Sequence, residues 1–401
     1  MRLRAGYDWG VLRFLHTADL HLGKGFHRRG AACRERLRQA RFDAVRRVGE
    51  LATEHGAQFV LIAGDLFDSN SADDRTVVQG CEALRSLPVP VFAISGNHDA
   101  HEGPGSVWRR RPFMEEAEGW SGFEVLEPGL REAVFLKDWN VSLHAASLAE
   151  RHPQRDPLAS WQTRARGDTF RIGLAHGSVH GFGETSSNGS DRATAVPLGV
   201  ERVAGSLDYL ALGDWHSAGE VGERAWYSGT PEGTSHNERE PGQVLMVEVD
   251  EPGAEPSVTP LGSGRTCWHR HTVELHRAED VDALAAWFDG LDRPTDTLVR
   301  LEWSGSLPLG ERLRAQGLIK RQRDRLMEMD LRGPGPMPRP EPGELDALAG
   351  GGYVGAALAD LRTQAEGGGP ASEQAAWALG LLAGMLGDGV GGRSGGTDAA
   401  A

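Results

Sequence analysis

Short apolar segments rich in β-branched residues recur along the first two-thirds of this sequence, and each runs directly into a polar loop of Gly, Asp, Asn or His. Residues 11–15, 59–63 and 89–94 have this form, which is typical of buried strands. A helical pattern lies between the first two strands, and a second one at residues 73–87 is ended by Pro88. The first helical pattern consists of Leu37, Ala40, Ala44, Val45, Val48 and Leu51. This order of strand, loop, helix and strand predicts a layered α/β or α+β fold.

Polar residues follow the ends of the later expected strands as well. We expect those strands at residues 132–135, 141–145, 170–175, 207–212 and 243–249. A rigid strand fixes the loop that follows it, so functional side chains are commonly found in such loops.

Five motifs at these strand ends contain residues that can ligate metals. In chain order they are Asp19-Leu20-His21, Gly64-Asp65-Leu66-Phe67-Asp68, Gly96-Asn97-His98-Asp99, His176-Gly177 and Gly213-Asp214-Trp215-His216. Each motif alone is more often a turn than a ligand loop. Together they would gather carboxylates and imidazoles at one sheet edge, and such a cluster requires cations to offset charge repulsion and desolvation.

The same five motifs, in this order, resemble those of the calcineurin-like metallophosphoesterases over residues 12–229. The His-Thr-Ala-Asp-Leu-His-Leu-Gly wording of the first motif and the Gly-Asp-Leu-Phe-Asp of the second resemble the DNA-repair exonuclease branch. That branch contains the nuclease subunit of the bacterial SbcCD complex and its archaeal and eukaryotic counterparts. The resemblance implies a β-sandwich flanked by helices, followed by a small C-terminal α+β capping domain.

The resemblance also implies two metal sites, here called site A and site B. Site A would consist of Asp19, His21, Asp65 and His216. Site B would consist of Asp65, Asn97, His176 and Asp214, so that Asp65 bridges the two. At position 214 the nuclease family usually has His, and an Asp there adds negative charge and puts the metal preference and the rate in doubt.

Two further residues match the catalytic machinery of the family. His98 corresponds to the histidine that contacts the phosphate and protonates the leaving oxygen, and Asp68 to the acid that orients it. The oxygen and nitrogen ligands, without a thiolate, suit Mn²⁺, Fe or Zn²⁺, and the resemblance favours two Mn²⁺ ions. Two ions about 3.5–4 Å apart generate a hydroxide and clamp an in-line displacement at phosphorus.

The expected activity is metal-dependent phosphodiester hydrolysis on DNA, of the exonuclease or endonuclease type. Residues 28–47 carry eight arginines against Glu35 and Asp43, which favours a nucleic-acid substrate, although a solvated amphipathic helix explains them equally well. The main alternative is a phosphomonoesterase or cyclic-nucleotide phosphodiesterase acting on a small substrate. A metal-binding scaffold for an ATPase is a third hypothesis, which the intact ligand set and His98 disfavour.

The chain is expected to divide into a catalytic domain at residues 1–250, a capping or DNA-contacting domain at 262–332, a Pro/Gly linker at 333–343, a helical segment at 344–388 and a disordered tail at 389–401. Residues 251–260, with three prolines, read as a boundary segment. By family analogy the helical segment either docks the coiled coil of an ABC-type ATPase, through Leu345, Leu358 and Leu361 among others, or packs as an intramolecular hairpin. Association into a homodimer is left open.

Composition bears on the compartment and on the partners. Cys33, Cys81 and Cys267 lie far apart without a CxxC spacing, so neither a disulfide framework nor a zinc knuckle is indicated. No signal peptide or membrane span is apparent, and we expect a cytoplasmic protein with no membrane association. The net charge of -14 argues against indiscriminate DNA binding, but residues 1–60 carry twelve basic and six acidic side chains.

Overall fold

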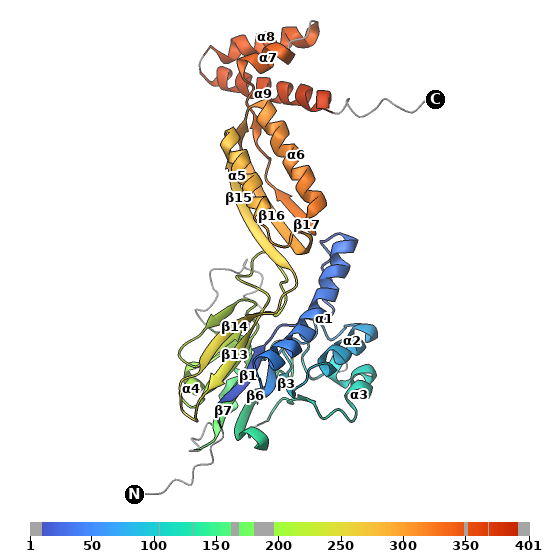
Figure 1. Ribbon diagram of the computed structural model, residues 1–401, viewed down its shortest axis with the longest axis vertical. Helices are drawn as coiled ribbons and strands as arrows, with labels where there is room; N and C mark the ends of the chain where they lie inside the picture. Colours follow the sequence, from blue (N-terminus) through green and yellow to red (C-terminus); the bar gives the residue numbers. More distant parts are fainter. Residues whose placement is uncertain are drawn as a thin grey trace, which may run out of the picture. The chain divides into compact units, whose positions relative to one another are not determined.

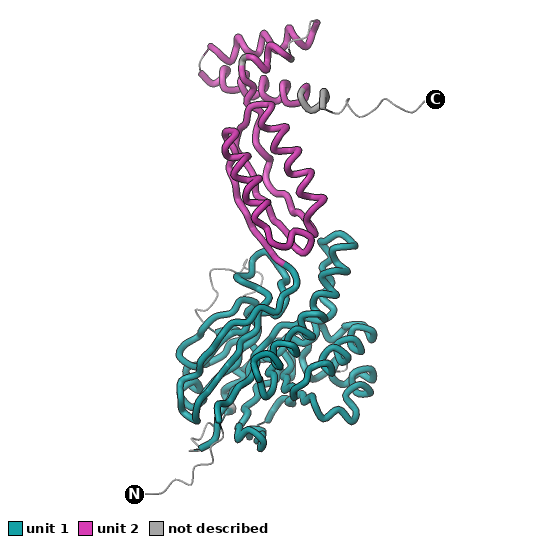
Figure 2. The backbone as a smooth tube through the Cα atoms, in the orientation of Figure 1, with its two compact units in different colours: residues 1–266 teal, residues 267–401 magenta. Residues whose placement is uncertain are grey.

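The computed structural model describes residues 10–103, 105–130, 132–161, 168–179, 196–348, 352–367 and 369–391. It divides into two compact units, residues 1–266 and 267–401 (Figure 2). Of the tail expected at 389–401, residues 389–391 end a helix and the remainder lies outside the described residues. Among the residues that the structure describes, no helix is both long and apolar enough to cross a membrane.

Unit 1 contains a first six-stranded sheet with the order β14-β13-β1-β2-β3-β4 (Figure 1). Its strands are β1 (Leu12–Thr17), β2 (Phe59–Ala63), β3 (Val91–Ile94), β4 (Phe123–Val125), β13 (Gln243–Val249) and β14 (Ser257–Gly262). The four strands from β1 to β4 run parallel, whereas β13 is antiparallel to both β1 and β14. The parallel strands therefore deliver their following loops to one edge of the sheet.

A second six-stranded sheet has the order β11-β12-β10-β7-β6-β5. Its strands are β5 (Val134–Leu136), β6 (Val141–Ala146), β7 (Phe170–His176), β10 (Tyr209–Gly213), β11 (Ala218–Glu220) and β12 (Ala225–Ser228). The neighbours β6, β7, β10 and β12 are parallel, and a small pair, β8 (Ser178–Val179) with β9 (Pro197–Leu198), follows β7.

The two sheets pack face to face as a β-sandwich. Successive side chains of a strand point to opposite faces, so Phe14 enters the core between the sheets while Leu15 faces the helices. Helices α1 (Ala31–Glu54) and α2 (Asp74–Arg85) cover the outer face of the first sheet. In the described part of this unit the further helices are α3 (Arg111–Ala117), α4 (Glu201–Ala204) and the 3-10 turns Val107–Arg109, Lys137–Trp139 and Pro157–Ser160. The expected sandwich flanked by helices is confirmed.

Unit 2 begins with alternating strands and helices. They are β15 (Cys267–Leu275), α5 (Ala278–Asp289), β16 (Thr297–Leu307), α6 (Leu309–Arg325), β17 (Glu328–Arg332) and β18 (Met337–Pro338), with a 3-10 turn at Pro294–Asp296. The strands are parallel, and the two helices pack their apolar residues against the sheet. Helices α7 (Pro342–Leu348), α8 (Tyr353–Ala365) and α9 (Pro370–Gly391) follow.

Two segments that were expected to be a boundary and a linker contain regular secondary structure. The boundary segment at 251–260 contains most of β14, because an edge strand tolerates Pro260 while it pairs with β13. Helix α6 ends at Arg325, and pairing with β16 places the residues from 328 to 332 in β17. The linker expected at 333–343 contains β18, which pairs with β16, and the start of α7.

The helical segment buries part of the apolar seam that was considered for docking. Leu345 and Leu358 lie in a small core with residues of α6 and α9. The large apolar side chains that α8 and α9 leave exposed are instead Tyr353, Val354, Trp377 and Met385.

Candidate two-metal centre

The five motifs meet at one edge of the sandwich, and all of their candidate ligands are described. Asp19 and His21 follow β1, Asp65 follows β2, Asn97 follows β3, His176 ends β7, and Asp214 and His216 follow β10. The first two loops are joined by backbone hydrogen bonds, from Asp19 N to the Gly64 oxygen (3.1 Å) and from His21 N to the Asp65 oxygen (2.9 Å). The relative position of these loops is therefore fixed by main-chain contacts.

Four of the candidate ligands adopt left-handed backbone conformations. The φ angles are 55° at Asp19, 44° at His21, 54° at Asp65 and 100° at Asp214. Such conformations are uncommon for residues other than glycine, and they cost on the order of 1–3 kcal/mol unless the surroundings impose them. Their concentration in these loops indicates that unfavourable backbone conformations are retained because they direct the side chains toward the cluster.

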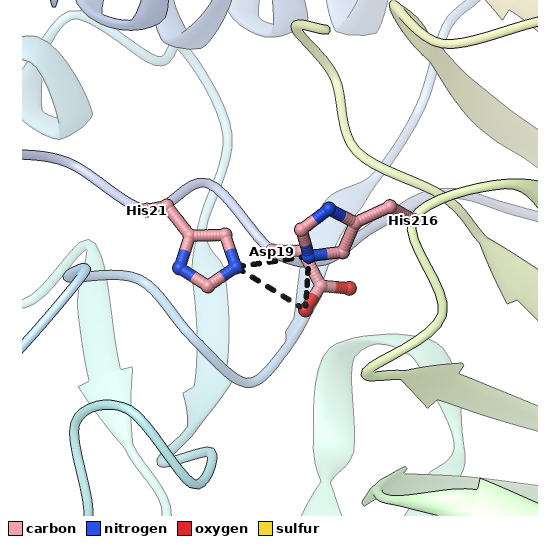
Figure 3. A group of neighbouring side chains, drawn as sticks. All are labelled: Asp19, His21 and His216. Carbon is pink, nitrogen blue, oxygen red and sulfur yellow. Dashed lines mark hydrogen bonds and ion pairs between the residues drawn. The ribbon is translucent and has the colours of Figure 1, made fainter. Parts of the chain in front are cut away.

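The expected ligands of site A converge. His21 Nε2 lies 3.1 Å from His216 Nε2, and each of these nitrogens lies 3.9 Å from Asp19 Oδ1 (Figure 3). Donors that each lie about 2.0–2.2 Å from one cation are separated by roughly 3–4 Å. The spacing of these atoms fits a shared metal ion.

Asp65 lies between this group and the expected ligands of site B. Its Oδ2 is 3.7 Å from His21 Nε2 and 3.6 Å from His176 Nε2. On the site B side, His176 Nε2 is 3.3 Å from Asn97 Oδ1 and 3.8 Å from Asp214 Oδ1. One carboxylate oxygen thus lies within reach of both donor groups, as a bridging ligand must.

Glycines provide the space for this close packing. A Cβ on Gly96 would overlap the Asp65 carboxylate, and a Cβ on Gly64, which has a φ of +93°, would overlap the His176 ring. The glycines in these two motifs are therefore steric requirements of the cluster.

Two hydrogen bonds orient the histidines toward the cluster. His176 Nδ1 donates to the Ala63 oxygen (2.8 Å), and His216 Nδ1 donates to Glu238 Oε1 (2.9 Å). A metal-binding imidazole is commonly held through its other nitrogen in this way, which leaves Nε2 as the ligand atom. Glu238 was missed from the sequence because it lies in an irregular segment without a motif.

The structure places Asp68 differently from the role that the resemblance implied. The atom that accepts from His98 Nδ1 is the backbone oxygen of Asp68 (2.8 Å), not its carboxylate. The carboxylate lies 3.3 Å from His21 Nδ1 and 3.1 Å from Lys24 Nζ. The side chain of Asp68 therefore supports a site A ligand, whereas its main chain orients His98.

Asp214 stands where the nuclease family usually has His, and two hydrogen bonds hold this residue in place. Ser178 Oγ donates to Asp214 Oδ2 (2.5 Å), and the Asp214 amide donates to Asp19 Oδ2 (3.0 Å). The carboxylate is thus held beside site B by a hydroxyl, and its own backbone fixes a site A ligand. Ser178 carries no signal in the sequence beyond its closeness to His176.

Burial and neighbouring charges shift the pKa values of the ionisable groups in this cluster. Burial, together with neighbouring carboxylates, raises the pKa of Asp19 to about 6. Burial lowers the pKa of His176, but Asp65, Asp19 and Asp214 outweigh it and raise that pKa to about 9. Negative charge held so close requires compensating positive charge, and divalent cations supply it. The residues present therefore fit a metal centre.

Arg41 reinforces the first metal loop from helix α1. This fully buried side chain donates through Nε to the Leu20 oxygen (2.5 Å) and through Nη2 to the Asp19 oxygen (2.9 Å). It also contacts the Glu232 oxygen (3.2 Å) and Thr230 Oγ1 (3.3 Å). One of the eight arginines in residues 28–47 is thus part of the interior, a role that the charge pattern could not distinguish.

Two other polar residues near the motifs are structural. His16 is buried between Tyr209 and the Leu212 oxygen, and burial lowers its pKa to about 3, so it is neutral. Asp99 accepts from the amides of Gly96 (2.7 Å) and Phe67 (3.1 Å), which closes the loop that carries Asn97.

Comparison with known proteins supports the same interpretation. A 26% identity over 317 residues relates the chain to "Uncharacterized metallophosphoesterase YhaO" of Bacillus subtilis, covering 76% of this chain and 72% of that protein. A subunit of the SbcCD nuclease of Bacillus subtilis is 22% identical over 313 residues, or 69% and 75% of the two chains. "DNA double-strand break repair protein Mre11" of Archaeoglobus fulgidus is 36% identical over 91 residues, or 22% and 19%.

A family model described as calcineurin-like phosphoesterase matches residues 12–218, about half of the chain. This range contains all five motifs, from Asp19 to His216, and most strands of the sandwich described above. Because the matched region and the converging ligands coincide, the chain belongs to the calcineurin-like phosphoesterase family, whose members are metal-dependent phosphoester hydrolases.

Proposed function

We propose that this phosphoester hydrolase is a two-metal phosphodiesterase that cleaves DNA. The observation that carries the proposal is the position of Asp65 Oδ2, which lies 3.7 Å from a nitrogen of site A and 3.6 Å from a nitrogen of site B. A mononuclear hydrolase would not need a carboxylate shared between two donor groups.

When bound, a pair of divalent cations would supply Lewis-acid polarisation of the phosphate and would lower the pKa of the attacking water. Asp19, His21 and His216 would hold one cation, and Asn97, His176 and Asp214 the other, with Asp65 shared. These donors are oxygens and nitrogens without a thiolate, and they suit Mn²⁺, Fe or Zn²⁺, of which we propose Mn²⁺.

His98 is the proposed general acid for the leaving oxygen. Its Nδ1 donates to the Asp68 backbone oxygen, which leaves Nε2 as the nitrogen available to the substrate. Its amide donates to Asp65 Oδ1 (2.9 Å), so the loop that carries it is attached to the shared ligand. A proton held at Nε2 would pass to the oxygen that departs from phosphorus.

The choice of DNA as substrate is supported by the names of two relatives, a nuclease subunit and a double-strand break repair protein. By the same analogy we propose that unit 2 contributes to DNA contact and that a coiled-coil ABC-type ATPase is the partner. The exposed apolar side chains of Tyr353, Trp377 and Met385 are available for that contact. All three cysteines are free, as suits the cytoplasmic location that we propose.

The test is an assay of the purified protein with Mn²⁺ on single-stranded and double-stranded DNA, beside the small diester bis(p-nitrophenyl) phosphate. We expect DNA cleavage that chelation abolishes and Mn²⁺ restores. Efficient hydrolysis of the small diester or of cyclic nucleotides, with DNA left intact, would refute the DNA substrate and favour a small-substrate phosphoesterase.

A further inference from the structure

The arginines of helix α1 differ in what they contact. Arg41 is buried against the first metal loop, whereas Arg46 pairs with Asp43 (2.8 Å) and Arg47 with both Glu50 (2.9 Å) and Glu54 (2.7 Å). Within the part of the chain that the structure describes, Arg34 and Arg38 form no ion pair. These two side chains keep their charges available for a ligand.

The position of the two arginines relates them to the metal centre. Residues 34, 38 and 41 are spaced as i, i+4 and i+7 and therefore share one face of α1. Arg41 is the last of this stripe of three arginines, and it donates to the backbone oxygens of Asp19 and Leu20. With a rise of about 1.5 Å per residue, Arg38 lies about 4.5 Å and Arg34 about 10.5 Å farther along the helix axis. The stripe thus leads away from site A.

Arg34 and Arg38 also line a cavity of about 380 Å³, together with Gly25, His27, Ala31 and Glu35. A Cβ on Gly25 would overlap the His27 ring, so the absence of a side chain there makes room for the imidazole. The residue before Gly25 is Lys24, whose ammonium contacts Asp68 at the metal centre. One residue of the cavity lining is therefore adjacent in sequence to a residue that contacts Asp68 at the metal centre.

We propose that this cavity is a phosphate subsite, which binds a backbone phosphate of the DNA strand some distance from the bond that is cleaved. Two guanidinium groups on one helix face provide forked donors that match phosphate oxygens, and His27 adds a further donor. Glu35 is the one carboxylate in the lining, and it opposes the anion. The proposal rests on the proposed function, since it concerns how that site selects a polymer over a small diester.

The test compares two double variants of the full chain that remove the same charge from the same helix. Arg34→Gln/Arg38→Gln changes the subsite, and Arg46→Gln/Arg47→Gln is the matched control. With Mn²⁺, KM and kcat are measured on a single-stranded oligonucleotide and on bis(p-nitrophenyl) phosphate. The salt dependence of oligonucleotide affinity is measured by fluorescence anisotropy.

For the subsite variant we expect KM on the oligonucleotide to rise roughly tenfold, because charge-assisted contacts to phosphate are lost, with unchanged kinetics on the small diester. The slope of log affinity against log salt should fall by about 0.7 for each phosphate contact removed. The control variant should have KM, kcat and oligonucleotide affinity close to those of the parent protein. Glu35→Gln should bind the oligonucleotide more tightly than the parent protein.

Equal losses in the two double variants would overturn the subsite, since net charge alone would then explain the effect. A loss on the small diester in the subsite variant would also overturn it, because the damage would lie in the metal centre. Absence of any DNA binding or cleavage by the parent protein would refute the proposed function and the subsite together. The two failures are therefore distinguishable.

Discussion

Replacing Arg41 with methionine should destabilise the protein strongly, although the substitution keeps an unbranched chain of similar length. The guanidinium donates to the backbone oxygens of Asp19, Leu20 and Glu232 and to Thr230 Oγ1. Burial lowers the pKa of Arg41, but the charge of Glu232 acts in the opposite direction and favours the cation. Methionine fills the space and supplies none of these donors.

The magnitude follows from what remains buried in the variant. A buried acceptor that loses its donor costs roughly 1–3 kcal/mol. Four acceptors lose a donor in the variant, and the buried Glu232 carboxylate also loses a nearby opposing charge. The Glu232 carboxylate keeps the amides of Arg265 and Thr266, so its own loss is limited. We expect a loss of about 3–5 kcal/mol, a large part of a typical unfolding free energy of roughly 5–15 kcal/mol.

Urea unfolding of the metal-free protein, followed by circular dichroism, measures this loss as a lower midpoint at an unchanged slope. Arg46→Met is the matched control, because its exposed pair with Asp43 should contribute at most about 1 kcal/mol. Arg41→Lys keeps the charge and should recover part of the loss. If Arg41→Met unfolded within about 1 kcal/mol of the parent protein, Arg41 would not brace the metal loop as described.

Three further substitutions separate the roles of residues around the two sites. Asp214→Ala should lose the site B metal and keep the site A metal, whereas Asp214→His should keep both metals. Two full-occupancy metals in the alanine variant, measured by elemental analysis, would exclude Asp214 as a ligand. His98→Ala should bind both metals yet cleave DNA about 10²–10⁴-fold more slowly. That deficit should shrink on a p-nitrophenyl diester, and an equal deficit on both substrates would rule out proton transfer by His98. Asp68→Ala keeps the backbone oxygen that orients His98, so it should weaken metal binding at site A without changing how the cleavage rate depends on the leaving group. Unchanged metal binding with an altered leaving-group dependence would show that the Asp68 carboxylate orients His98.

The local patterns were sufficient to predict a layered fold and the loops that carry the candidate ligands, whereas the sandwich was an expectation from the family resemblance. β2 is apolar along its whole length and runs into Gly64 and Asp65, so the strand and its functional loop are evident in one short segment. The parallel order of β1, β2 and β3 then brings their three loops together. The loops that carry His176, Asp214 and His216 follow strands of the second sheet, and the packing of the two sheets brings them to the same edge.

The residues that support the ligands could not be predicted, since their roles arise only when distant segments meet. Glu238 reaches His216 from an irregular segment, and Arg41 reaches Asp19 from the middle of a helix that reads as amphipathic. The contact between Asp68 and His98 has the same origin, because a motif identifies a residue but not whether its side chain or its backbone makes the contact. The edge strand β14 was missed because Pro260 within it and Pro256 just before it argue against a strand, and only the pairing with β13 reveals one.

The metal content and turnover of Asp65→Asn test the central claim, a carboxylate shared by two cation sites, most directly. The parent protein and the control Asp43→Asn, which changes a carboxylate on α1 outside the cluster, should each bind two Mn²⁺ ions per chain and hydrolyse a phosphodiester. Asp65→Asn should lose both the paired stoichiometry and the turnover, because one oxygen serves both donor groups. Two bound ions with undiminished turnover in Asp65→Asn would contradict the shared-ligand account.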